Sequence, residues 1–212
     1  MGIKERKERE KERRRQQIIV AAKRVFSRKG YTKTTMEDIA TEAELSPGTL
    51  YLYFKSKDEL YASLCLRVLQ FMNMKIEHVN SDANMAYGDR LDALMKAMWD
   101  IYEFDPLILN NVFHLQSSET LLNLTPDLLK EITDLSRKSL QGMAQVFKRG
   151  IEAETVIECH PFVLADIFWS LFSGTVLWEE TKKITSEDRF NLEENIKTAF
   201  DIFKRGVLVE AG

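Results

Sequence analysis

Residues 30–60 read GYTKTTMEDIATEAELSPGTLYLYFKSKDEL and contain three separate helix-start signals. Thr35 can cap a helix that opens at the next residue, where apolar residues begin to recur with helical spacing. Ser46-Pro47 is a second start, because the first position of a helix needs no free main-chain N–H. The run from Ser56 to Glu59 is a third start, a capping box. The spacing predicts two short helices and the beginning of another, which is the plan of a helix-turn-helix.

The second of these short helices, predicted over Pro47 to Phe54, has two unlike faces. At about 100° per residue, Leu50 and Phe54 fall on one side and anchor the helix inward. The opposite side carries small, hydroxyl, phenol and alkyl groups, from Gly48, Thr49, Tyr51 and Leu52, with Tyr53 at the rim. Such groups suit a DNA major groove, where hydroxyls bond base edges or phosphates and apolar groups touch the thymine methyl. The alternative is a short structural helix of an all-α protein.

This stretch resembles the DNA-binding domain of the TetR/AcrR family of bacterial transcriptional regulators. The matching residues are Gly30-Tyr31, Thr34-Thr35, Ile39-Ala40, Ser46 to Gly48, Leu50-Tyr51, Tyr53-Phe54 and Lys57 to Leu60. The resemblance covers roughly the first quarter of the chain. It implies a ligand-responsive regulator, acting as a repressor, that binds double-stranded operator DNA as a homodimer and is released by a small hydrophobic effector.

The expected DNA contacts divide by role. Gly48, Thr49 and Tyr51 are expected to touch bases or the adjacent backbone. The phosphate contacts are expected from Thr35, Ser46, Tyr53 and Lys57, helped by the positive ends of their helices, with Lys33 and Lys55 beside them. The complete expected surface is Lys33, Thr34, Thr35, Ser46, Pro47, Gly48, Thr49, Tyr51, Leu52, Tyr53, Lys55 and Lys57.

The composition indicates an all-α protein with two domains. Only nine glycines and four prolines occur in 212 residues, and each proline precedes an apolar periodic run. We predict a helix-turn-helix DNA-binding domain with a charged arm over 1–56, and a helical effector-binding and dimerisation domain over 57–212. Helices are expected over 16–29 (stopped by Gly30), 56–79, 89–104, 106–115, 126–153, from 161 onward, and 186–209.

Charge is distributed unevenly along the chain. Residues 1–55 carry a net charge of +6 and the remainder −9, giving −3 in total. A basic N-terminal part attached to an acidic remainder is typical of a DNA-binding domain joined to a domain that does not bind DNA. The arm KERKEREKERRRQQ (4–17) has opposite charges three or four residues apart, which can continue the first helix backwards. Two interpretations stay open for it: Arg13 to Arg15 reach phosphates or a minor groove, or the arm is a frayed, solvated tail.

The body offers residues for an apolar effector site. Methionine and aromatic side chains recur at helical spacing, and such linings suit varied hydrophobic molecules. The expected lining is Phe71, Met72, Met95, Met98, Trp99, Tyr102, Phe113, His114, Met143, Phe147, Phe168 and Trp169. The competing interpretation is ordinary core, with His114 satisfied by a neighbour.

The last two predicted helices suit a dimer contact. The helix beginning at Pro161 is apolar nearly all round, so it must be covered on several sides. Two such helices meeting their copies across a two-fold axis would form a four-helix interface. The expected contact residues are Phe162, Leu171, Gly174, Leu177, Trp178, Ile196, Phe200 and Phe203. Burial inside one subunit is the alternative.

Several other classes of function have no support in the sequence. No GxSxG, Gly-rich phosphate loop, HExxH or paired-cysteine motif occurs, so no catalytic site, metal or cofactor is expected. The charged start is unlike a secretory signal, and the apolar run from Phe162 to Trp178 falls short of a membrane span. Cys65 and Cys159 are expected to be reduced in a cytoplasmic protein. The alternatives are a helical enzyme or carrier of hydrophobic molecules that retains a basic head, and a sequence-neutral DNA-coating protein.

Overall fold

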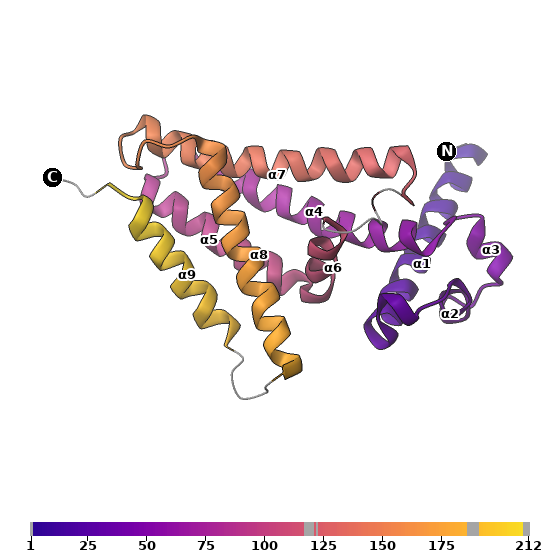
Figure 1. Cartoon of the computed structure of the whole chain (residues 1–212). Helices are drawn as coiled ribbons and strands as arrows, with labels where there is room; N and C mark the ends of the chain where they lie inside the picture. Colours follow the sequence, from indigo (N-terminus) through magenta and orange to yellow (C-terminus); the bar gives the residue numbers. More distant parts are fainter. Residues whose placement is uncertain (1, 117–120, 122, 186–190, 210–212) are drawn as a thin grey trace. The chain divides into compact units, whose positions relative to one another are not determined.

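The computed structural model shows an all-helical protein, which confirms the predicted fold class (Figure 1). It describes residues 2–116, 121, 123–185 and 191–209. Among these residues, Val156 and Leu208 form an isolated antiparallel β-bridge. The helices in chain order are α1 (Ile3–Lys33), α2 (Met36–Glu42), α3 (Pro47–Tyr51), α4 (Lys57–Ser81), α5 (Tyr87–Phe104), α6 (Pro106–Gln116), α7 (Pro126–Glu152), α8 (Pro161–Thr185) and α9 (Leu192–Val207).

The chain packs as two compact units. The first comprises Met1–Arg67 with His114–Ile132, and the second comprises Val68–Phe113 with Thr133–Gly212. Both α4 and α7 therefore contribute residues to each unit. The predicted boundary after residue 56 falls at the start of α4, whose first turns belong to the first unit.

Helix α1 begins much earlier than the apolar stripe that anchors it. The stripe at 18–26 is buried, but the helix extends back to Ile3 through the charged arm. Within the arm, Arg13 pairs with Glu10 at 2.7 Å, one of the opposite-charge spacings that favour a solvated helix. The predicted break at Gly30 is confirmed by its φ of 75° and ψ of 161°, a conformation that residues with a Cβ rarely adopt. The arm is therefore helical rather than frayed.

In the second unit, two asparagines of α4 bind main-chain carbonyls of α7. The Asn73 amide donates to the carbonyl of Leu135 at 2.9 Å, and the Asn80 amide donates to that of Gly142, also at 2.9 Å. The donors and acceptors both advance along the chain, so the two helices run parallel here. A Cβ at Gly142 would lie 2.5 Å from Cγ2 of Ile76 on α4, so any larger residue there would force a neighbouring atom to shift.

An aromatic core joins α7, α8 and α9. Phe168 stacks on Phe200 with ring centroids 4.9 Å apart, and Phe147 meets Phe203 edge to face at 5.8 Å. Phe200, Phe203 and Ile196 are all buried inside this unit, at 9 % exposure or less. The single apolar stripe of α9 is therefore used inside the subunit to cover α8 and α7, and a dimer contact through these three side chains stays a prediction.

Helix α8 keeps a second apolar face at the surface. Phe162, Val163, Ile167 and Trp178 are between 40 % and 65 % exposed, while Phe168, Phe172 and Val176 are buried. By length and composition the 23 residues Pro161–Lys183 are enough to cross a membrane, so the expectation that this run is too short needs correction. A core helix of a folded domain can have the same length and apolar composition. The buried side of α8 packs as such a core helix does.

Glu179, near the end of α8, ties this helix to the start of α9. Its buried carboxylate accepts hydrogen bonds from the Asn191 main-chain N–H at 3.2 Å and the Asn195 amide at 2.5 Å, and it also pairs with Lys182. Burial acts to raise the pKa of Glu179, but the hydrogen bonds from Lys182, Asn191 and Asn195 outweigh it and hold the pKa below its ordinary value.

Candidate nucleic-acid interface

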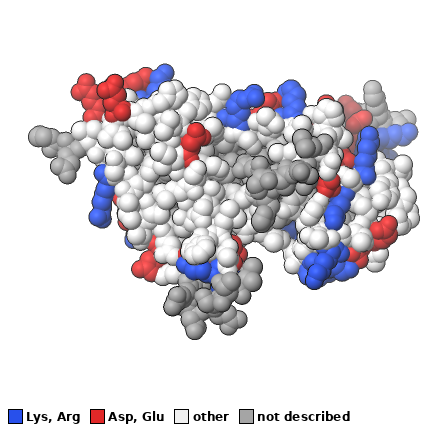
Figure 2. Space-filling model, in the orientation of Figure 1, with Lys and Arg blue, Asp and Glu red and all other residues white. Residues whose placement is uncertain are grey.

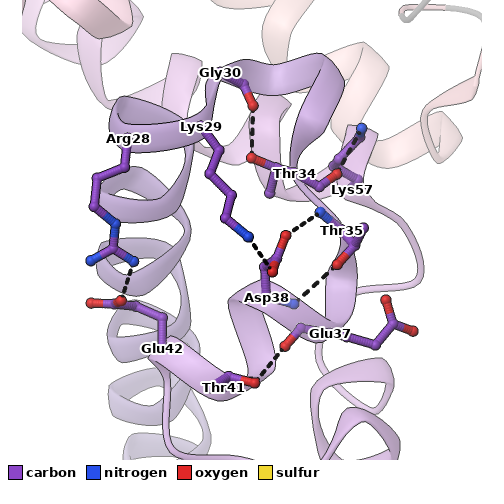
Figure 3. Close-up of polar contacts among 10 residues, drawn as sticks. All are labelled: Arg28, Lys29, Gly30, Thr34, Thr35, Glu37, Asp38, Thr41, Glu42 and Lys57. Atoms are coloured by element: carbon purple, nitrogen blue, oxygen red, sulfur yellow. Dashed lines mark hydrogen bonds and ion pairs between the residues drawn. The ribbon is translucent and has the colours of Figure 1, made fainter.

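The start of α2 is fixed by a reciprocal cap (Figure 3). Thr35 Oγ1 accepts from the Asp38 N–H, and the Asp38 carboxylate accepts from the Thr35 N–H, both at 3.1 Å. Lys29 of α1 also donates to Asp38 at 2.5 Å. These bonds, led by that from Lys29, hold the pKa of Asp38 below its ordinary value. The predicted cap at Thr35 is confirmed, and it joins α2 to α1.

Helix α3 starts as predicted but ends three residues early. Ser46 Oγ accepts from the Thr49 N–H at 3.1 Å, which confirms the predicted cap. The helix then stops at Tyr51 instead of Phe54, because the N–H groups of Leu52 and Tyr53 bond the carbonyls three residues before them. This tight last turn brings Phe54 inward, and Leu50 and Phe54 are both fully buried, as predicted.

The outward face of α3 and the turn after it is accessible and uncharged. Leu52 is 80 % exposed and Tyr51 47 %. The preceding residues Ser46, Pro47 and Gly48 are exposed, whereas Thr49 and Tyr53 are half-buried. The structure therefore gathers these predicted contact residues on one surface, where a hydroxyl, a phenol and an alkyl group lie within two turns of chain.

Two predicted contacts are engaged inside the first unit instead. Thr34 is 2 % exposed and its hydroxyl donates to the Gly30 carbonyl at 2.7 Å, so the expectation that its side chain meets DNA is wrong. The Lys57 ammonium donates to the Thr34 carbonyl at 3.0 Å (Figure 3). It also donates to the Tyr31 carbonyl at 2.9 Å and lies 4.4 Å from the centre of the Tyr31 ring. Thr34 and Lys57 thus hold the end of α1 to the start of α4.

The capping box at the start of α4 differs slightly from the expected form. The Glu59 N–H donates to Ser56 Oγ at 3.1 Å, as predicted. The Glu59 carboxylate, however, accepts from the N–H of Lys55 at 2.7 Å, one residue before the cap. The side chains of Lys33, Thr35 and Lys55 are exposed beside α2 and α3, where they stay predicted phosphate contacts.

The residues expected to line an effector site divide into two environments. Met72, Met98, Phe113, Met143, Phe147 and Phe168 are buried, and Phe71, Met95, Trp99, Tyr102 and Trp169 are half-buried. Met95 and Trp99 line an open groove of about 230 Å³ with Ile196 and Phe200. The side chain of His114 lies outside the described residues. A single cavity formed by the whole set stays a prediction.

A capped short helix with an accessible, uncharged face, joined by a brief turn to a helix that packs on α1, defines a helix-turn-helix DNA-binding protein. Residues 18–64 match the model of bacterial regulatory proteins of the tetR family. A transcriptional regulator of the helix-turn-helix type from Haemophilus influenzae is 32 % identical over 139 residues, which is 66 % of this chain and 71 % of the relative.

Solved structures share the fold at low sequence identity. PfmR from Thermus thermophilus, a regulator of the TetR family, has a TM-score of 0.70 at 22 % identity, covering 89 % of this chain and 97 % of PfmR. SmeT, solved in complex with triclosan, has a TM-score of 0.66 at 21 % identity and covers 93 % of each chain. The chain belongs to the TetR/AcrR family of transcriptional regulators.

Proposed function

We propose that this regulator is a dimeric, cytoplasmic repressor that releases its operator when a hydrophobic small molecule binds the second unit. The observation that carries the proposal is the outward face of α3. Tyr51 and Leu52 are exposed, while Leu50 and Phe54 on the other side are fully buried. One side of this five-residue helix is buried. The side chains that remain at the surface are of the kind that can enter a major groove.

The charge around this face supports binding to a polyanion. Lys33 is exposed near the capped start of α2, and Lys55 is exposed near the capped start of α4. Main-chain N–H groups at helix starts bind phosphates as well, because they carry partial positive charge. In this proposal Gly48, Thr49 and Tyr51 read bases, and Thr35, Ser46, Tyr53, Lys33 and Lys55 position the backbone.

The exposed face of α8 supports the dimer. In Figure 2 the surface over α8 is mostly free of charged side chains. Phe162 and Trp178 are exposed on α8, and Gly174, between them in sequence, has no atom within 4 Å of an added Cβ among the described residues. Leu171 and Leu177 are half-buried on the same helix. Two copies joined through this face would read half-sites about 34–36 Å apart or at a multiple of that distance.

The effector is proposed to act through α4, which contributes residues to both units. The apolar and aromatic composition of the second unit favours a hydrophobic ligand, and SmeT, of the same fold, was solved with triclosan. Coupling of about 1–3 kcal/mol between effector and operator would weaken DNA binding about 5- to 150-fold, enough for a switch.

The experiment that tests this function uses DNA selected by the purified protein from a random-sequence library. Tyr51→Ala should weaken binding to the selected duplex by about tenfold, the cost of one good base contact, and leave the dimer intact. Met74→Ala is the control, because Met74 is 54 % exposed on α4 within the second unit. Unchanged affinity of Tyr51→Ala would remove α3 from the interface.

The same selection separates the alternatives. A sequence-neutral DNA-coating protein would enrich no duplex and bind all sequences equally. A helical enzyme or carrier would enrich none either, and would turn over or retain hydrophobic compounds irrespective of DNA.

A further inference from the structure

Arg15 of α1 joins three parts of the first unit. Its Nη1 lies 3.4 Å from the main-chain carbonyl oxygen of Tyr53, and its Nη2 donates to the Ser63 hydroxyl at 3.2 Å. The guanidinium carbon lies 4.2 Å from the centre of the Phe54 ring, close enough for a cation–π contact. Tyr53 and Phe54 directly follow α3, and Ser63 is a buried residue of α4. A single side chain therefore links α1, the exit of α3 and α4.

The short length of α3 makes this link important. A helix of five residues is unstable by itself and takes its position from its tertiary contacts. Its inward side is held by Leu50 and Phe54, and the turn that follows is held by N–H groups of Tyr53 and Phe54 donating to the Leu50 carbonyl at 3.0 and 3.1 Å. Arg15 binds the carbonyl at the end of that turn.

Arginine suits this position because its planar, charged fork can donate in two directions while one face stacks on an aromatic ring. A cation at the C-terminal end of a helix also interacts favourably with the partial negative charge there. Both terminal nitrogens of Arg15 face protein acceptors, and its carbon lies over Phe54. The interpretation that Arg13 to Arg15 reach phosphates or a minor groove is therefore not supported for Arg15 by its placement.

We propose that Arg15 is a positioning residue for sequence reading. It holds the exit of α3 at a fixed angle, so that Thr49 and Tyr51 meet the bases in register, and it does not bind DNA itself. The inference rests on the proposed reading role of α3 and adds a residue to it from outside the helix-turn-helix.

The first test compares Arg15→Met with Arg14→Met on a duplex selected by the wild-type protein and on a scrambled duplex of equal length. Both variants lose one positive charge from the same turn of α1. In Arg15→Met, affinity for the selected duplex should fall about tenfold, the scale of losing hydrogen bonds to a charged group. Affinity for the scrambled duplex should stay within about twofold, and the salt dependence should be unchanged, because no phosphate contact is lost.

Ser63→Ala provides a second variant that cannot act by touching DNA, since Ser63 is 4 % exposed on α4. It should weaken specific binding by about threefold, and it should add nothing in the Arg15→Met background, because the two residues act through one contact. A conservative Arg15→Lys change should restore part of the specific affinity, since lysine can still donate to the Tyr53 carbonyl.

Amide hydrogen exchange of the free protein gives a readout that needs no DNA. The amides of Tyr53 and Phe54 should exchange about tenfold faster in Arg15→Met, while those of Ile39 and Ala43 in and after α2 should not change. If the wild-type protein selects no duplex, the proposed function fails, while this measurement still decides whether Arg15 holds the exit of α3.

Three results would overturn the proposal. A salt slope lowered by about one, with equal loss on both duplexes, would make Arg15 a phosphate contact. A lower unfolding midpoint with an unchanged ratio of specific to non-specific affinity would reduce its role to general stability. Unchanged exchange at Tyr53 and Phe54 would show that it does not hold the exit of α3.

Discussion

Gly150 of α7 offers a direct test of the packing in the second unit. A Cβ at this position would lie 2.3 and 2.6 Å from Cε2 and Cζ of the Tyr87 ring and 2.6 Å from Cγ2 of Val156. Contacts below 3.0 Å are essentially never seen for real Cβ atoms, so both neighbours would have to move. These two neighbours belong to different elements: Tyr87 is the first residue of α5, and Val156 is held by its bridge to Leu208.

The expected size of the effect follows from two opposing terms. Alanine favours a helix interior over glycine by about 1 kcal/mol, whereas overpacking costs about 1–3 kcal/mol. Because an aromatic ring and a main-chain-paired residue must both shift, the cost lies near the upper end. Gly150→Ala should therefore destabilise the protein by about 2 kcal/mol, which is small enough to leave it folded.

Urea unfolding measures this change as a lower midpoint at an unchanged slope. Gly206→Ala is the matched control, because among the described residues no atom lies within 4 Å of a Cβ there, and it should stabilise α9 by up to about 1 kcal/mol. If Gly150→Ala proved as stable as the Gly206 control, the close approach of Tyr87 and Val156 to α7 would be refuted.

Three further predictions concern other contacts. The pKa of Glu179 is lower in the folded chain than its ordinary 4.5, so its contribution to stability is full above about pH 4.5 and is lost as pH falls through the folded pKa. Glu179→Gln should therefore reduce the loss of urea midpoint between about pH 5 and 3, and an equal loss in both proteins would show that Glu179 contributes nothing. Asn73→Ala should lower the free energy of unfolding by about 1–2 kcal/mol, because the Leu135 carbonyl loses a donor; a denaturation midpoint matching wild type would contradict this. Gly174→Trp should yield monomers in sedimentation without lowering the unfolding midpoint, whereas intact dimers would place the contact elsewhere.

The sequence predicted the structure correctly at positions where only a few residue types fit the local backbone. Thr35 and Ser46 are caps, as predicted, because an oxygen-bearing side chain directly before an apolar periodic run satisfies the first N–H groups of a helix. Gly30 was predictable as a break for the same kind of reason, since its φ of 75° suits glycine. The buried pair Leu50 and Phe54 followed from helical spacing alone.

Features that depend on partners far along the chain could not be predicted. Arg15 sits in a run of three arginines, and no local signal distinguishes the one whose acceptors lie 38 and 48 residues away. Likewise, the apolar stripe of α9 fits a dimer or an intramolecular contact equally well by periodicity, and only the placement of Phe168 shows that Phe200 is used within the subunit. Thr34 was placed on the expected DNA surface together with Thr35, but the turn after Gly30 directs its hydroxyl inward.

The parallel contact between α4 and α7 also constrains how this chain can change in length. Asn73 and Asn80 are seven residues apart, as are the carbonyls of Leu135 and Gly142 that they reach. Inserting one residue between the two donors would rotate every later side chain by about 100° and carry the second amide away from its acceptor. Insertions over 82–125, between the two helices, leave this spacing unchanged. Within the helices, the two hydrogen bonds could be kept only if both seven-residue intervals changed in length together.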